Sequence, residues 1–204
     1  LIAHENIRKR MTTEQVSIFS NTTTPPYPQG ALPVLTFNDR LSLHLNGETA
    51  TAYYVASGHT DGDSIIHFPV SNVIHMGDMF FNGLYPYVDL DAGGSMQGLV
   101  AAADLALSMA DESTRIIPGH GPLGITEDLK TYRDYLVQAG ANVQALIDED
   151  MSLQQIIAAK PTSEWDEALG KTWITPAQFV TFIYNSLQGI QRYTPPPVDK
   201  TEQE

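Results

Sequence analysis

Apolar and polar residues alternate most clearly in the segment 41–45. The alternating residues are Leu41, Ser42, Leu43, His44 and Leu45. Because successive side chains of a strand point to opposite faces, this period of two predicts a strand with one wet face. Asn46 and Gly47 follow, and they predict a type I′ hairpin because both central residues of that turn need a positive φ. The returning strand is expected over residues 49–56.

The first 30 residues predict a strand and a short helix before a long loop. Residues 1–3 are strand-like, and residues 5–11 place Ile7 and Met11 four positions apart on one helical face. The segment 20–30 is rich in Thr, Pro and Asn. Prolines remove hydrogen-bond donors and fix φ, so this segment is predicted to form no regular structure.

Strands in the middle of the chain lead into glycine-rich turns. Two strands are expected at residues 64–68 and 72–76, and the second runs into the turn MGD. A further short strand at residues 114–117 ends in the sequence PGHG. The ends of these strands are therefore the places where we expect functional residues to collect.

From residue 95 onward the pattern is mainly helical. Ser95 is expected to cap a helix that runs to about residue 110, and Thr126 to cap a long helix. The apolar stripe of the long helix consists of Leu129, Tyr132, Leu136, Val143 and Leu146. Ser-x-x-Gln at Ser152 and Thr-x-x-Gln at Thr175 fit the capping box, in which each side chain satisfies a free backbone donor. The C-terminal third is therefore predicted to be helical.

Composition favours one globular domain. The chain has 204 residues, of which 42% are hydrophobic and 17% charged, enough for one sizeable core. Strands dominate up to residue 76, strands and helices alternate afterwards, and no composition shift marks a second domain. We predict a single α/β domain over residues 1–193 and a disordered tail over residues 194–204.

The charge balance excludes several classes of partner. The formal net charge is -13 and the densest basic cluster is Arg8-Lys9-Arg10, so binding to nucleic acid or to an anionic membrane is not expected. No apolar run approaches the ~20 residues of a membrane span. A small-molecule substrate is compatible with this surface. The chain has no Cys, so any metal must be held by His and carboxylates.

Three short motifs each place a metal-competent side chain between small residues at the end of a predicted strand. They contain His59 in GHT, Asp78 in MGD and His120 in PGHG. Glycine lets the backbone turn sharply and approach a ligand, while imidazole and carboxylate suit Zn²⁺ at ~2.0–2.2 Å. Each motif alone is a weak signal, since a lone His in a turn is more often a hydrogen-bonded structural residue.

In this order and spacing, the motifs resemble the later metal motifs of the metallo-β-lactamase superfamily. The match extends to GHTDGDSIIHFP, NVIHMGD, IIPGHGP and the opening IAHENIRKRM, and it covers Ala3 to about Tyr135. The resemblance implies a four-layer αβ/βα sandwich, with two mixed sheets face to face and helices outside. It also implies that His59 binds one metal ion, that His120 binds a second, and that Asp78 bridges both, with zinc as the expected metal.

The HxHxDH motif, which supplies the remaining ligands in this family, is absent from the sequence. The family places it upstream of Leu1, and because the chain starts in an apolar segment rather than at Met, we interpret the N-terminal half of the domain as incomplete. Each ion would receive two ligands from this chain, where a zinc site uses about four. Two zinc ions are expected in the intact parent protein, whereas this chain should bind zinc weakly or not at all and be inactive.

The resemblance leaves the substrate open among esters, thioesters, lactones and lactams. Phe81 stands three residues after Asp78, where many β-lactamases of the family use Lys to anchor a carboxylate, which argues against a typical β-lactamase. The alternative function is a non-catalytic binding or assembly module derived from the same fold. The incomplete half should expose a sheet edge and an apolar face, which predicts a homo-oligomer.

Other candidate residues have structural interpretations. His44 is expected to be solvated, His67 to be structural, and His75 to be buried in the core, with a contact to the metal site as its alternative. Asp61 and Asp63 are expected to stabilise a turn through their side chains, with orientation of the His59 imidazole as the alternative. A cluster that fits core packing and an apolar cleft equally well comprises Met76, Met79, Phe80 and Phe81.

Overall fold

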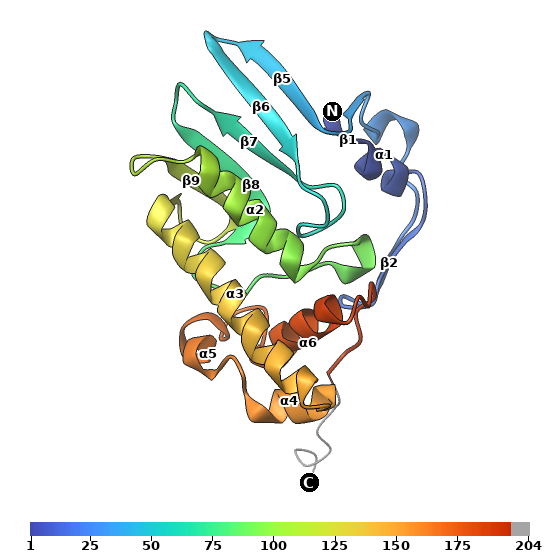
Figure 1. The fold of residues 1–204 in the computed structure, drawn as a ribbon. Helices are drawn as coiled ribbons and strands as arrows, with labels where there is room; N and C mark the ends of the chain where they lie inside the picture. Colours follow the sequence, from blue (N-terminus) through green and yellow to red (C-terminus); the bar gives the residue numbers. More distant parts are fainter. Residues whose placement is uncertain (197–204) are drawn as a thin grey trace.

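A six-stranded mixed sheet forms the centre of the fold (Figure 1). Its strands are Arg40–Leu45 (β5), Glu48–Tyr54 (β6), Ser64–Phe68 (β7), Val73–Phe81 (β8), Arg115–His120 (β9) and Gly124–Ile125 (β10). They are ordered β10-β9-β8-β7-β6-β5, and neighbours are antiparallel except β8 and β9, which run parallel. The structure is a computed structural model and describes residues 1–196.

The predicted hairpin between β5 and β6 is confirmed. Asn46 and Gly47 have φ values of 52° and 76°, as a type I′ turn requires. The register pairs Leu41 with Ala52 and Leu43 with Ala50, so these four apolar side chains share one face of the sheet. The alternation in the sequence therefore fixes both the strand and its register.

Strand β8 continues beyond the turn that the sequence predicted at Gly77 and Asp78. Gly77 has a φ of +55°, and the pairing with β9 shifts its register between His75 and Gly77. A left-handed glycine inside a strand is the mark of a β-bulge rather than of a chain reversal. The bulge lets the strand run on to Phe81, with Asp78 immediately after the irregularity.

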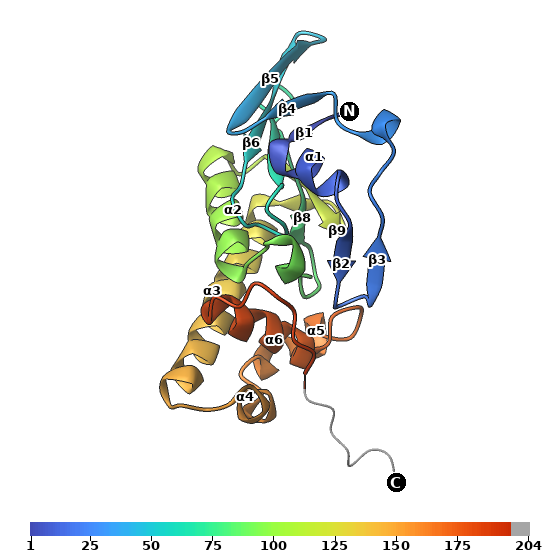
Figure 2. The same ribbon diagram turned by 90° about the vertical axis from the view of Figure 1, so that its right-hand side faces the viewer.

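Two long helices cover one face of the sheet. They are α2 (Met96–Met109) and α3 (Thr126–Asp148), which lie on the same side in Figures 1 and 2. Against them the sheet presents Ile65, Ile74 and Ile116, all with 0% exposure. Three shorter helices, α4 (Leu153–Ala159), α5 (Ser163–Leu169) and α6 (Pro176–Leu187), gather around the C-terminal half of α3.

Helix starts follow the predicted capping residues with one exception. Ser95, Ser152 and Thr175 each accept a hydrogen bond from the backbone N–H of the third residue onward. The prediction that Thr126 caps the long helix is wrong by one position, because Thr126 is already helical. The carboxylate of Asp128 accepts the backbone N–H of Ile125 instead, and so satisfies a donor that the helix leaves free.

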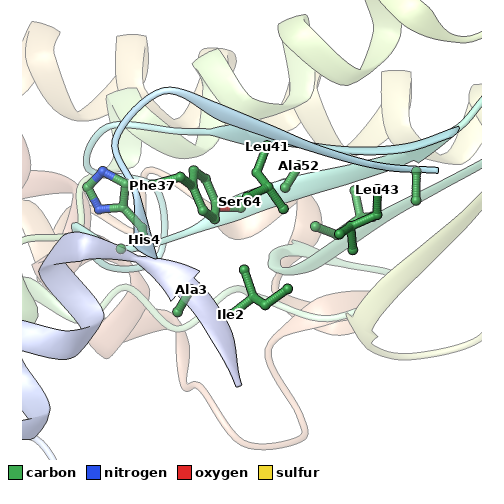
Figure 3. A pocket seen from close by; sticks show the side chains of 11 residues that line it. Ile2, Ala3, His4, Phe37, Leu41, Leu43, Ala52 and Ser64 are labelled. Carbon is green, nitrogen blue, oxygen red and sulfur yellow. The ribbon is translucent and has the colours of Figure 1, made fainter. Parts of the chain in front are cut away.

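The opposite face of the sheet carries a much smaller cover. It consists of β1 (Ile2–His4), α1 (Glu5–Met11) and β4 (Leu35–Phe37), with β1 and β4 paired in parallel (Figure 2). Between this cover and the sheet lies an apolar cavity of about 360 Å³ (Figure 3). It is lined by Ile2, Ala3, His4, Phe37, Leu41, Leu43, Ala50, Ala52, Gly62, Ser64 and Ile66. We call this face of the sheet, opposite α2 and α3, the open face.

The segment expected to lack regular structure forms part of a hairpin. β2 (Gln15–Ser17) pairs antiparallel with β3 (Thr22–Thr24), and Gln29–Ala31 form a short 3₁₀ turn. The prolines begin only after Thr24, so three β-branched threonines remain free to pair. Asn21 adopts the left-handed conformation before β3, with a φ of 51°.

Most of the tail predicted to be disordered, residues 194–204, lies outside the described residues. Within residues 1–196, no helix combines the length and the apolar character needed to cross a bilayer. The described chain is consistent with one α/β unit whose core joins β7, β8 and β9 to helices α2, α3 and α6.

Candidate metal centre

The fold brings the three candidate ligands together from three different segments. His59 lies in the loop between β6 and β7, Asp78 follows the bulge in β8, and His120 is the last residue of β9. Nδ1 of His59 is 3.9 Å from Oδ2 of Asp78, and Nε2 of His120 is 3.5 Å from Oδ1 of Asp78. Each carboxylate oxygen thus faces a different imidazole, which is the arrangement of a bridging carboxylate.

Glycine is required where β9 passes the carboxylate. A Cβ atom placed on Gly119 would lie 2.0 Å from Oδ1 of Asp78 and 2.7 Å from its backbone nitrogen. No side chain fits such a distance, so Gly119 is what allows His120 and Asp78 to approach each other. Part of the predicted PGHG motif is therefore a packing requirement of the site.

The loop that carries His59 is held by its own carboxylates. Asp63 accepts hydrogen bonds from the backbone N–H and the hydroxyl of Thr60, both at 2.8 Å. Asp61 accepts two hydrogen bonds from the Arg10 guanidinium, at 2.7 and 2.8 Å. The predicted turn-stabilising role is confirmed for Asp63, whereas Asp61 ties the loop to helix α1. Burial raises the pKa of the Asp63 carboxyl, which the hydrogen bonds from Thr60 partly offset.

Backbone contacts fix the same loop against the start of helix α2. The carbonyl of His59 accepts the N–H of Asp89 at 3.0 Å. A Cβ atom on Gly94 would lie 2.0 Å from that carbonyl oxygen, and one on Gly98 would lie 1.6 Å from the carbonyl oxygen of Ser57. These close approaches hold His59 through main-chain atoms, which leaves its imidazole free for another partner.

The three residues fit part of a metal centre. Nε2 of His59 is buried and has no hydrogen-bond partner among the described residues, while Nδ1 is the ring nitrogen that faces Asp78. The side chains of Asp78 and His120 are 39% and 46% exposed, so solvent reaches the site. However, nowhere in residues 1–196 do three His, Asp or Glu side chains converge as ligands of one ion. The set supplies two donors to each of two positions and no third.

The other histidines lie outside this group. His44 is exposed, as predicted, and its Nδ1 also lies 2.9 Å from the Thr49 hydroxyl. The predicted core position of His75 is wrong: its side chain is exposed on the open face, opposite Ile66 of β7. An apolar strand indicates burial, but the pattern does not show that one face of the sheet is covered only in part.

His4 has a structural role that the sequence did not reveal. It is only 5% exposed, its Nδ1 accepts the backbone N–H of Asn6 at the start of α1, and its Nε2 lies 3.0 Å from the carbonyl oxygen of Asn38. Its ring stacks on Tyr54 with centroids 3.7 Å apart. His is an unusual helix cap, so ordinary capping rules could not have found it.

Aromatic rings surround the two histidines of the site. Tyr87 lies 5.4 Å from the His59 ring, Phe81 stacks on His120 at 4.9 Å, and Trp173 lies 5.7 Å from His120. Burial raises the pKa of the Tyr87 hydroxyl, so this ring remains a neutral phenol. Sequence reasoning missed Tyr87 and Trp173, because nothing in their local sequence indicates that they meet.

The apolar cluster in β8, which the sequence left open between the core and a substrate cleft, lies in the core. Its members Met76, Met79, Phe80 and Phe81 are all at most 1% exposed. Phe81 differs from the others because its ring also contacts His120. A buried phenyl ring in that position offers no charge to an anionic substrate.

Comparison with known proteins identifies the fold and the family. The family model of the Metallo-beta-lactamase superfamily matches residues 2–133, which is more than half of the chain. The chain therefore belongs to this superfamily, and the resemblance stated from its motifs is confirmed. A search of curated proteins found no match.

Solved structures of the same fold are similar at low sequence identity. The sec-alkylsulfatase Pisa1 from Pseudomonas sp. is 17% identical with a TM-score of 0.61, covering 81% of this chain and 27% of its own. The BLEG-1 B3 metallo-beta-lactamase is 20% identical with a TM-score of 0.54, covering 66% of this chain and 64% of its own. A metallo-beta-lactamase family protein from Thermus thermophilus is 15% identical with a TM-score of 0.56, covering 82% of this chain and 52% of its own.

These identities show the fold alone, and the chain spans less than two thirds of each of these proteins. The predicted metallo-β-lactamase-like α/β architecture is confirmed by the match. The chemistry of the neighbours differs, since one is a sulfatase and another a β-lactamase. A shared fold does not choose among such chemistries, so the reaction has to be argued from the site.

Proposed function

We propose that this chain carries part of the dinuclear zinc centre of a hydrolase that acts on an ester, thioester, lactone or lactam bond. The observation that supports the proposal is the position of Asp78, whose two oxygens face His59 and His120 at 3.9 and 3.5 Å. His59 and Asp78 would hold one ion, and Asp78 and His120 the other. The second supporting feature is that the His59 ring makes no hydrogen bond through its buried Nε2 among the described residues, so the imidazole is not committed to another partner on that side.

Zinc, when bound, supplies an activated water nucleophile and polarises the carbonyl group of the substrate. The residues of this chain position that chemistry. The bulge at Gly77 aims Asp78 toward both imidazoles, and the contacts of the loop at residues 57–63 hold His59 through its backbone. The exposed edges of Asp78 and His120 leave the site accessible to a substrate.

Two donors for each ion form only half of a usual zinc site. We therefore expect the 204-residue chain to bind less than one tight zinc equivalent and to show negligible hydrolysis. Elemental analysis after dialysis against a chelator measures the first property. Full, tight zinc occupancy in this chain would contradict the expected weakness.

Weak zinc binding can be assigned to these residues by calorimetric titration of matched variants. Asp78→Asn removes the shared carboxylate and should lower zinc affinity roughly tenfold or more. Gly119→Ala should have a similar effect, since its Cβ atom would occupy the position of Oδ1 of Asp78. Gly140→Ala and His44→Gln are the controls, because a Cβ atom on Gly140 meets nothing within 4 Å and His44 is solvated far from the motif. Equal affinities in all four variants would refute the assignment.

Activity is tested with a panel of ester, thioester, lactone and lactam substrates. The panel is applied to the chain as given and to the chain expressed with any coding sequence that precedes Leu1. Restored zinc and turnover in the longer protein, both lost in Asp78→Asn, are the expected results. Tight zinc binding without turnover of any of these bonds would reject the proposed reaction.

A non-catalytic binding or assembly module is the second candidate. It is favoured by one observation, that no third ligand joins either pair within residues 1–196. The longer protein distinguishes the two candidates, because a module would gain neither zinc nor hydrolysis.

A further inference from the structure

Three aromatic side chains from distant segments meet beside the candidate metal centre. Phe19 and Tyr87 have ring centroids 4.7 Å apart, Tyr87 and Trp173 are 5.4 Å apart, and Phe19 and Trp173 are 6.3 Å apart. We call Phe19, Tyr87 and Trp173 the aromatic wall. Each member contacts both of the others, so the wall is one continuous surface.

One end of the wall is anchored in the core. Phe19 packs against Phe182 at 5.7 Å and against Tyr193 at 5.2 Å, and these two residues are 0% and 5% exposed. Tyr87 also packs against Phe182, at 5.7 Å. Phe19 and Tyr87 make these core contacts, so the position of the wall does not depend on the Trp173 side chain.

The other end of the wall is open and lies next to the site. Trp173 is 49% exposed, although its ring lies 5.7 Å from His120 and touches two other rings. Tyr87 lies 5.4 Å from the His59 ring at the same time. The wall therefore spans from one candidate ligand to the other, with part of the largest ring uncovered.

The charged groups that act on the wall are carboxylates, because the pKa of the Tyr87 hydroxyl, raised by burial, is raised further by Asp89 and Asp91. The cations nearest in the sequence to the site are already paired. Arg10 is bound by Asp61, two residues after His59, and Lys171, two residues before Trp173, is bound by Glu167. The apolar ring of Phe81 stacks on His120. These groups give an anionic substituent no unpaired cation to contact, whereas an uncharged ring can stack on the wall.

We propose that the aromatic wall binds an uncharged aromatic or bulky apolar substituent of the substrate, and that Trp173 is the residue that determines this specificity. The proposal rests on the proposed hydrolase function, because the wall flanks the residues assigned to the metal. The proposed substrates are thereby narrowed to esters, thioesters, lactones or lactams that carry an apolar substituent next to the bond that is cleaved.

Binding to the wall can be measured without metal or turnover. The chain has two tryptophans, Trp165 and Trp173, so Trp165→Phe leaves Trp173 as the sole indole. In metal-free Trp165→Phe protein, phenylacetamide should quench the fluorescence saturably, while acetamide, which lacks the ring, should not. The reciprocal variant Trp173→Phe reports on Trp165 alone and should show no saturable change.

Affinities are then compared by ligand-observed NMR. Trp173→Ala should weaken phenylacetamide binding about three- to tenfold, whereas Trp173→Phe should largely preserve it, because one aromatic contact contributes about that factor. Phenylacetate has the same ring with a negative charge and should bind more weakly than the amide. Equal binding of phenylacetamide to wild type and Trp173→Ala, or tighter binding of phenylacetate, would overturn the proposal.

The same variants separate this proposal from the hydrolase assignment. In an active longer protein, Trp173→Ala should lower kcat/KM for methyl phenylacetate about three- to tenfold more than for methyl acetate. An equal loss for both esters overturns the specificity role. If zinc binding and turnover fail while phenylacetamide still binds through Trp173, the hydrolase assignment falls and the aromatic site remains.

Discussion

The two faces of the central sheet are built from the same strands but are covered very differently. Under helices α2 and α3, residues such as Ile65 and Ile74 are completely buried. On the open face, Leu43 is 38% exposed and lines a cavity of about 360 Å³ (Figure 3). Alternation decides which side chains share a face of the sheet. Whether those side chains are buried from solvent depends on the elements that pack on that face.

The difference follows from the size of the covering elements. Helices α2 and α3 contribute apolar stripes of several turns, including Leu99, Ala103 and Leu136, which are at most 1% exposed. Strands β1 and β4 contribute three residues each and cannot span the strands beneath them. We therefore expect the stability of the fold to reside mainly on the helix-covered face.

The largest expected effect compares the same truncation on the two faces. Leu99→Ala, in α2, should lower the free energy of unfolding by about 3 kcal/mol, because it leaves a cavity in a closed core. Leu43→Ala should lower it by less than about 1 kcal/mol, because that side chain is already partly in water. Urea unfolding of both variants measures the difference. Similar losses would mean that the open face is covered in solution.

How far the sequence could predict this architecture depends on the range of the signal. The hairpin at Asn46-Gly47 and the capping boxes at Ser152 and Thr175 were predictable, because each depends on neighbouring residues. The pairing of β1 with β4 joins segments over 30 residues apart through only three residues each. No local periodicity indicates such a contact.

The candidate site divides in the same way. The glycine-rich motifs indicated His59, Asp78 and His120, since small residues beside metal-competent side chains are a local pattern. The aromatic wall was not predictable, because it joins residues 19, 87 and 173 through tertiary packing alone. The turn predicted at Gly77 is wrong, because a glycine beside a strand is compatible with a turn and with a β-bulge. Only the pairing with the neighbouring strand distinguishes the two.

The second prediction compares substitutions that enlarge a side chain on each face of the sheet. Ala103→Val in α2 should lower the free energy of unfolding by about 2 kcal/mol, because its site is fully packed and a larger side chain forces strain. Ala52→Val points toward the cavity and should raise it by about 1 kcal/mol. Thermal unfolding of the two variants measures whether each substitution lowers or raises the free energy of unfolding. Destabilisation by both substitutions would show that the cavity is already filled in solution.

The third prediction concerns what the open face does at higher protein concentration. Leu43 and Leu45 lie on β5, the edge strand of the sheet, and are 38% and 66% exposed. Exposed apolar edges pair with other chains, so we expect the protein to form a dimer or a larger oligomer. Leu43→Lys should weaken this association about tenfold by placing a charge on the edge.

Size-exclusion chromatography with light scattering measures this association. Val137→Lys is the matched control, because Val137 is 41% exposed but lies on helix α3, away from the open face. A stable monomer at high concentration would contradict the predicted assembly. Dissociation by the Val137 substitution alone would move the interface to the helical side.

The smallest expected effect is a pH dependence at two carboxylates, the exposed Asp111 and the half-buried Glu48. Asp111 follows helix α2, and hydrogen bonds from Asn72 and Ser113 lower the pKa of its carboxyl to about 2. Glu48 is the first residue of β6, which pairs with the edge strand β5, and hydrogen bonds from Ser71 lower the pKa of its carboxyl as well. Both groups should titrate below their values in the unfolded chain.

The sign of the effect follows from linkage between protonation and folding. A carboxylate whose pKa is lower in the folded state stabilises that state above its unfolded pKa, and this contribution is lost as the pH falls through the folded pKa. For Asp111 the loss should therefore extend from about pH 4 down to about pH 2. Asp111→Asn should flatten the acid limb of the stability profile in that window, and Glu48→Gln should do so less. Carboxyl-carbon NMR titration gives the two midpoints directly, and a midpoint near 4 for Asp111 would show that its hydrogen bonds from Asn72 and Ser113 are not kept in solution.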